Sequence, residues 1–140
     1  MPVAELWDPC TIPSDALVGA GVDPEVIGSG QYGSSDNEWK YCTFHQDWFL
    51  LSVLSTTNSL EKVREDPRNE QLSDARVGNR DAIVYLESTS SFQPSCFVSL
   101  AVEQGAVAVR ISVAANARTS GDQCAEATRL ADDLIEHLPN

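Results

Sequence analysis

Two runs of alternating apolar residues near the C-terminus constrain the fold of this chain more than any other feature. The residues at every second position are, in the first run, Cys96, Val98, Leu100 and Val102 and, in the second, Val107, Val109, Ile111 and Val113. A period of two is typical of a strand with one buried face. Gln104-Gly105 between the runs has turn chemistry. The two runs therefore predict a β-hairpin with one face in the core.

A long amphipathic helix is predicted after this hairpin. Ser120 or Asp122 can cap its first turn, and Pro139 follows its end. The apolar stripe has the spacing of one helical face and comprises Cys124, Ala127, Thr128, Ala131, Leu134, Ile135 and Leu138. We expect this stripe to pack on the hairpin, so that residues 95–138 form the unit around which the rest of the chain is organised.

The remaining elements are shorter and less strongly patterned. The expected helices and strands are, in chain order, a helix at 15–20, a brief helical start at 23–25, a hairpin of 38–44 and 48–55, a helix ending before Pro67, and a strand at 81–87. The polar stretches 28–37, 68–74 and 88–95 are expected to be loops. Residues 1–140 therefore predict a single domain of the α+β class, with a curved antiparallel sheet and helices packed on it.

Four cysteines, Cys10, Cys42, Cys96 and Cys124, bear on the compartment. They are too far apart for zinc knuckles, so two disulfides in an oxidising compartment fit better. Of the three possible connectivities we favour Cys10–Cys42 and Cys96–Cys124, since each pair would join neighbouring elements and the second would fasten the C-terminal helix to a strand. Four free thiols in a cytosolic protein are the alternative.

The net charge of −12, from 21 acidic and 9 basic residues, excludes some partners. It argues against nucleic acid, whose binding depends on Lys and Arg, and against direct attraction to an anionic membrane. The general role of such a charge is solubility. The more specific hypothesis is an acidic inhibitor or immunity-type protein that neutralises a basic enzyme.

No catalytic constellation is found, so we expect no catalytic residue, cofactor or metal. His45 is placed in a predicted turn and His137 at a helix end, each without a recognisable nucleophile. The neighbours in Glu65-Asp66 and Asp132-Asp133 would point about 100° apart on a helix. Residues 36–38 have too few ligands for a calcium loop. A hydrolase with an unrecognised site remains a third hypothesis, because a fold excludes no chemistry.

Five aromatic residues form the candidate binding surface. Trp39 and Tyr41 share one face of a predicted strand, and Trp48, Tyr85 and Phe92 are close enough in the predicted topology to meet them. Aromatic residues usually fill cores, but Trp and Tyr are also favoured at recognition surfaces. The polar stretches 28–37 and 88–95 could edge such a surface.

Several cysteine-bearing segments carry a family resemblance. In chain order they are "DPCT", "WKYC", "VGNRDAIVY", "PSCFVSLAV" and "GDQCAEATRLADDLIEHLP". Together they resemble the actinobacterial (mycobacterial and nocardial-type) cell-envelope lipoproteins classed as a domain of unknown function. That family is distantly similar to the extracellular sensor domains of mycobacterial receptor kinases. The resemblance covers nearly the whole chain, and it provides the four cysteines as structural positions and no catalytic residues.

The resemblance implies an exported, non-enzymatic binding or sensor module of the cell envelope. A lipid on a cysteine upstream of the domain would anchor it to the outer face of the cytoplasmic membrane. Met1-Pro2-Val3 lacks the basic and apolar regions of a signal peptide, so we expect the targeting segment to precede this sequence. The expected partner is an envelope protein or an amphiphilic ligand, bound by a monomer.

The cysteine pairing can be measured directly. A non-reducing peptide map with intact mass, on protein purified with blocked thiols, should give two bonds, Cys10–Cys42 and Cys96–Cys124. Four free thiols in protein made under oxidising conditions would contradict both the compartment and the resemblance.

Overall fold

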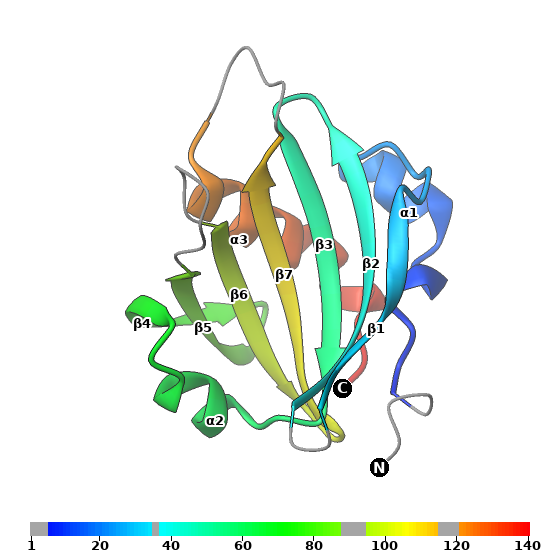
Figure 1. Ribbon diagram of the computed structural model, residues 1–140. Helices are drawn as coiled ribbons and strands as arrows, with labels where there is room; N and C mark the ends of the chain where they lie inside the picture. The colour runs from blue at the N-terminus through cyan, green and yellow to red at the C-terminus, as the bar shows by residue number, and fades with distance from the viewer. Residues whose placement is uncertain (1–5, 35–36, 88–94, 115–120) are drawn as a thin grey trace.

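The computed structural model describes residues 6–34, 37–87, 95–114 and 121–140. Its strands are β1 (Gly28–Ser34), β2 (Asn37–Gln46), β3 (Phe49–Thr56), β4 (Asn69–Val77), β5 (Arg80–Glu87), β6 (Ser95–Val102) and β7 (Gly105–Val113). Its helices are η2 (Pro9–Thr11), α1 (Ser14–Gly19), α2 (Leu60–Glu65), α3 (Gln123–Leu134) and η3 (Ile135–His137). The strands form one antiparallel sheet with helices packed on it, which confirms the predicted α+β class (Figure 1).

The sheet consists of two meanders joined at its centre. Its strand order is β1-β2-β3-β7-β6-β5-β4, so each strand pairs with its neighbour in sequence except at the β3–β7 contact. The connection through α2 carries the chain from β3 at the centre to β4 at the far edge. Both meanders therefore contribute strands to one continuous surface.

One face of the sheet, here called the helix side, carries the main hydrophobic core. Helix α3 crosses behind the central strands and α1 lies behind the β1–β2 end (Figure 1). The predicted hairpin is confirmed as β6 and β7, and its inward-facing Val98, Leu100 and Val109 are fully buried. Leu17 of α1 and Leu134 of α3 belong to the same core.

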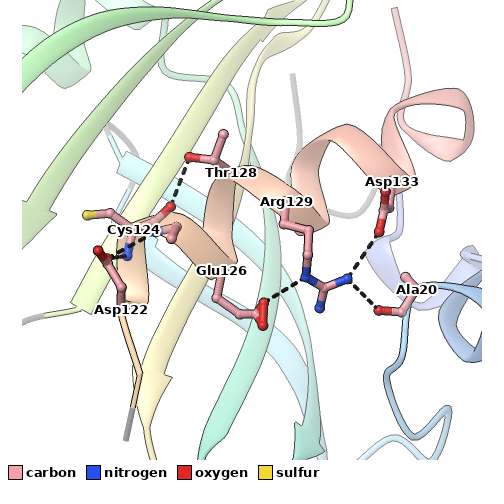
Figure 2. Close-up of polar contacts among 8 residues, drawn as sticks. Ala20, Asp122, Cys124, Glu126, Thr128, Arg129 and Asp133 are labelled. Carbon is pink, nitrogen blue, oxygen red and sulfur yellow. Dashed lines mark hydrogen bonds and ion pairs between the residues drawn. The ribbon is translucent and has the colours of Figure 1, made fainter.

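Helix α3 begins where the sequence predicts. The Asp122 carboxylate accepts hydrogen bonds from the backbone N–H groups of Cys124 and Ala125, at 2.9 and 3.1 Å, and so caps the first turn (Figure 2). The predicted apolar stripe is wrong at two positions. Leu130 is fully buried, whereas Thr128 is exposed and its hydroxyl donates to the Cys124 carbonyl at 2.9 Å.

Arg129 connects α3 to the N-terminal part of the chain. Its guanidinium donates to Glu126 and Asp133 on its own helix, at 2.8 and 3.1 Å, and to the Ala20 carbonyl after α1, at 2.9 Å (Figure 2). This carbonyl lies at the end of a helix, where backbone carbonyl groups lack hydrogen-bond donors from the helix itself. Arg129 therefore holds the two helical segments of the helix side together.

Both favoured disulfides are present. Cys10–Cys42 joins η2 to β2, and Cys96–Cys124 joins β6 to α3, with Cα–Cα distances of 5.3 and 5.1 Å. They enclose chain separations of 32 and 28 residues. On the chain-entropy model each stabilises the fold by about 3.5 kcal/mol. Both attach a segment of the helix side to the sheet.

Two predicted loops are edge strands instead. The stretch 28–37 was expected to be a loop, but β1 pairs with β2 from Gly28↔Thr43 to Ser34↔Asn37. A glycine is compatible with a strand where a large neighbouring side chain fills the space that its own side chain leaves empty. The Tyr41 ring does this at Gly30, where it lies 3.4 Å from the position a Cβ would have. The stretch 68–74 was also expected to be a loop and forms most of β4. A register shift between Glu70 and Ser73 breaks the alternation that would have identified it.

Three smaller predictions are corrected. The helical start at 23–25 is absent, because the Asp23 carboxylate accepts the Glu25 N–H at 3.0 Å in a local turn that competes with a helix. His45 lies within β2, and the turn of that hairpin is Asp47-Trp48. Of the predicted loop 88–95, Ser95 starts β6 and the rest lies outside the described residues.

The backbone at Gly105 gives a test of the β6–β7 turn. Gly105 has φ +146°, and a Cβ there would lie 2.2 Å from the Thr56 carbonyl oxygen. Gly105→Ala should therefore lower the free energy of unfolding by at least about 2 kcal/mol. Urea denaturation measures this, with Gly19→Ala as the control, since a Cβ at Gly19 meets nothing within 4 Å. Equal stability of the two variants would contradict the close approach of Gly105 to the Thr56 backbone.

Candidate functional site

The face of the sheet opposite α3, here called the open face, forms the candidate site. In Figure 1 this face is toward the viewer, and of the described helices only α2 lies on its side, at the lower left. A smaller apolar cluster under α2 includes Leu54, Val63, Ile83, Tyr85, Phe97 and Ala108. The strands that bury the main core on one side therefore present a second, less covered surface on the other.

Strand register places five side chains in one row across the open face. They are Tyr85 on β5, Phe97 on β6, Arg110 on β7, Ser52 on β3 and Thr43 on β2, each directly opposite the next. Directly opposed residues share a face and lie within side-chain reach. The neighbouring row continues through Ser99, Ala108, Leu54 and Tyr41.

Side-chain size makes this face hollow. Ser52, Ser99 and Ala108 are short, whereas Tyr41 and Phe97 on either side of them are long. The first hollow, about 500 Å³, lies toward α2 and is lined by Trp39, Leu54, Asn58, Lys62, Val63, Glu65, Asp66, Arg68, Asn69, Tyr85, Glu87, Phe97 and Arg110. The second hollow, about 490 Å³, is lined by Gln31, Tyr41, Thr43, Ser52, Leu54 and Arg110. Leu54 and Arg110 therefore separate two adjoining spaces.

Arg110 is the charged residue at the centre of the open face. Its Nη2 donates to the Ser95 hydroxyl at 3.2 Å, and its Cζ lies 5.6 Å from the centre of the Phe97 ring. Its Nε is buried and has no hydrogen-bond partner in the part of the chain that the structure describes. Within the described residues it forms no ion pair, although the arginines at 64, 68, 76 and 129 each do. A half-buried guanidinium without a counter-charge can bind an oxyanion.

Tyr85 and Phe97 form a rigid wall of the first hollow. Their rings are stacked, with centroids 5.1 Å apart and an interplanar angle of 7°. The Tyr85 hydroxyl is hydrogen-bonded to the Ser99 hydroxyl at 2.8 Å. Both rings are largely buried, so they shape the hollow more than they cover it.

The rim formed by α2 and the following turn is charged. Asp66 pairs with Arg68 at 2.7 Å, and the hydrogen bond from this guanidinium holds the pKa of the Asp66 carboxyl below its ordinary value. Lys62 and Glu65 lie on the same rim. Positive and negative side chains are therefore balanced around the first hollow, whereas Arg110 is the one charged residue among the described residues that line the second.

The structure brings three of the five predicted aromatic residues to the open face. Trp39 and Tyr85 line the first hollow and Tyr41 lines the second. Trp48 packs instead against the helix-side core, with its ring edge-on to Phe49 at 5.2 Å. Phe92 lies outside the described residues. Gln31, from the stretch predicted to edge the site, lines the second hollow.

Sequence reasoning missed Arg110, Ser52 and Phe97. One signal could have found the first: Arg110 stands in the middle of a strand whose other outward residues are Ala106, Ala108 and Ser112. A lone arginine among small side chains in a central strand is unusual, because an unpaired charge on a covered surface is costly. Ser52 and Phe97 are distinguished only by their register opposite Arg110.

The other candidates considered from sequence lie apart from this face. His45 and His137 are exposed on β2 and η3, and Asp132 and Asp133 are exposed on α3. Among the residues described, no group of three or more His, Cys, Asp or Glu side chains could hold a metal ion. In the same part of the chain, no helix has the length and apolar character needed to cross a bilayer.

A family model described as "Protein of unknown function (DUF3558)" matches residues 2–137, and the chain belongs to this family. No curated protein and no solved structure matches the chain.

The Asp66–Arg68 pair at the rim predicts a pH dependence. Because the folded pKa of Asp66 lies below the ordinary value of an aspartate, the pair stabilises the fold above that ordinary value, and the contribution is lost as the pH falls through the folded pKa. Asp66→Asn should lower the free energy of unfolding at pH 7 by up to about 1 kcal/mol, since the pair is partly exposed.

Urea denaturation from pH 7 down to pH 3 measures this difference. The gap between wild type and Asp66→Asn should narrow as the pH falls, while Asp132→Asn, at an exposed position on α3, should match wild type throughout. A gap that stays constant with pH would show that the charge of Asp66 is not what stabilises the rim.

Proposed function

We propose that this protein is a non-enzymatic binding module of the cell envelope, which holds an amphiphilic ligand on the open face of its sheet. The observation that carries the proposal is the pair of adjoining hollows that share Leu54 and Arg110. Each has a volume within the range of about 300–1,000 Å³ that is usual for small-molecule sites.

The lining of the hollows fits a ligand with apolar and polar parts. Trp39, Leu54 and Phe97 provide apolar surface in the first hollow, whereas the hydroxyls of Thr43 and Ser52 and the guanidinium of Arg110 are in the second. Small-molecule sites combine apolar surface with polar groups that fix the orientation of the ligand. A ligand that extends across both hollows would use both kinds of surface.

Two features support a location in the cell envelope. Two disulfides are typical of proteins that fold in an oxidising compartment. The resemblance of the cysteine-bearing segments to actinobacterial envelope lipoproteins agrees with export, a lipid anchor upstream and a sensor-like role. We propose that the module acts as a monomer whose contact with the membrane is through this anchor.

The alternative, an acidic inhibitor of a basic enzyme, has less support. A complementary inhibitor surface needs carboxylates gathered on one face. Here exposed carboxylates occur on α1, α2, β4, α3 and the β2–β3 turn, as in Asp15, Glu61, Asp74, Asp133 and Asp47. This distribution fits the general role of charge in solubility.

Amide chemical shifts provide the test. Uniformly ¹⁵N-labelled protein is titrated with three single-chain amphiphiles of equal chain length, decanoate, decyl phosphate and decyl maltoside, below their micellar concentrations. We expect saturable shifts at open-face positions such as Tyr41, Leu54 and Arg110. Buried α3 positions such as Ala131 serve as the internal control. Shifts confined to the helix side, or no saturable shift with any of the three compounds, would contradict the proposal.

A further inference from the structure

The guanidinium of Arg110 has unused binding capacity. Of its nitrogens, Nη2 donates to Ser95, while Nε is buried and has no partner among the described residues. Within the described part of the chain no carboxylate pairs with it. A guanidinium without a paired carboxylate keeps its positive charge uncompensated, and an oxyanion bound at the accessible end of the group would supply the missing counter-charge.

The position of this guanidinium is well defined before any ligand arrives. Arg110 extends from β7 between Val109 and Ile111, which are fully buried on the helix side, so its backbone is held by the core. The Phe97 ring 5.6 Å away and the hydroxyl of Ser95 orient its planar group. Preorganisation of this kind reduces the entropy lost on binding.

The second hollow offers further donors beside the guanidinium. The hydroxyls of Thr43 and Ser52 are hydrogen-bonded to each other at 2.8 Å. That bond uses one of the two hydroxyl protons, so one remains to donate to a ligand oxygen. Among the described residues that line this hollow there is no carboxylate and no second cation. Its chemistry is therefore that of an oxyanion site.

The first hollow has a different character. Half-buried Trp39 presents apolar surface beside the buried Leu54 and Phe97, while the charges of its rim are balanced between cations and anions. An apolar chain gains from burial here, and a free anion gains little. Leu54 and Arg110 border both hollows, so one ligand molecule could extend from one into the other.

We propose that Arg110 binds the carboxylate or phosphate head group of a single-chain amphiphile. The head group lies in the second hollow, against Arg110, Ser52 and Thr43, and the apolar chain lies in the first, against Trp39, Leu54 and Phe97. This inference rests on the proposed function and specifies the class of ligand.

The test compares head groups on one chain length. Calorimetric titrations of the whole chain use decanoate, decyl phosphate and decyl maltoside, with acetate and inorganic phosphate as chain-free anions. We expect the two anionic decyl compounds to bind at least about tenfold more tightly than decyl maltoside, since charge-assisted hydrogen bonds are the stronger kind. Acetate and inorganic phosphate should bind at least about a hundredfold more weakly, because they bury no chain. The ratio of decanoate to decyl phosphate affinity shows which oxyanion is preferred.

Variants assign the effect to Arg110. Arg110→Gln should weaken decanoate and decyl phosphate about tenfold to a hundredfold and leave decyl maltoside within about twofold. Arg110→Lys should retain part of the affinity, since it keeps the charge and loses the planar fork. Arg76→Gln removes the same charge from an exposed position near the end of β4 and should match wild type. Thr43→Val tests the second hollow without touching the arginine, and a several-fold loss for the anions is expected.

The outcomes separate this inference from the proposed function. Equal affinities of wild type and Arg110→Gln for the anionic compounds, with open-face binding intact, would overturn the head-group assignment alone. Binding of acetate or inorganic phosphate as tight as that of the decyl compounds would overturn the amphiphile and leave a simple anion site. Failure of all three decyl compounds to bind wild type would overturn the proposed function itself. If Arg110→Gln does not fold, Arg110→Lys and Thr43→Val still decide the matter.

Discussion

The pairing of β3 with β7 is the contact on which both the core and the candidate site depend. It joins two meanders that are otherwise separate along the chain, through eight antiparallel residue pairs from Phe49↔Val113 to Thr56↔Ala106. On the helix side it brings Val53 beside Val109, both fully buried, and so unites the core of the two halves. On the open face the same register sets Ser52 opposite Arg110. Core and candidate site therefore follow from one set of backbone hydrogen bonds.

Residue size explains why the two faces of the same strands differ. The helix side carries branched aliphatic residues, which form the buried core beneath α3. The open face of the central strands carries Ser52, Ala108 and Arg110, whose short or slender side chains leave room that neighbouring aromatic rings enclose. A hollow bordered by fully buried strands keeps its shape, and a rigid scaffold of this kind suits binding.

The disulfides act on the other side of the molecule. Cys10–Cys42 and Cys96–Cys124 attach η2 and α3 to the sheet from the helix side, and Arg129 adds the contact between α3 and the Ala20 carbonyl. None of these residues is among those that line the two hollows. The open face is thus stabilised from behind, which leaves its surface available for a ligand.

Elements with a strong local signal were predictable from the amino-acid sequence alone. Strict alternation in β6 and β7 and the Asp122 cap of α3 were sufficient for the hairpin and the helix, because period and capping act over short stretches of chain. The disulfide pairing is favoured among three connectivities because each pair would join neighbouring elements, and the structure confirms it. The sequence predicts loops where the edge strands β1 and β4 lie, since exposed strands rich in glycine or interrupted by a bulge lack alternation.

The candidate site, in contrast, depends on how distant strands pair. Tyr41 and Arg110 are 69 positions apart by their residue numbers, and they line the same hollow because β3 pairs with β2 on one side and β7 on the other. The sequence predicts Trp48 near the other aromatic residues, but Trp48 packs against the core of the helix side. It belongs to the two-residue turn Asp47-Trp48, at which the β2–β3 hairpin ends. Strand order and register are long-range properties, and they determine which side chains meet.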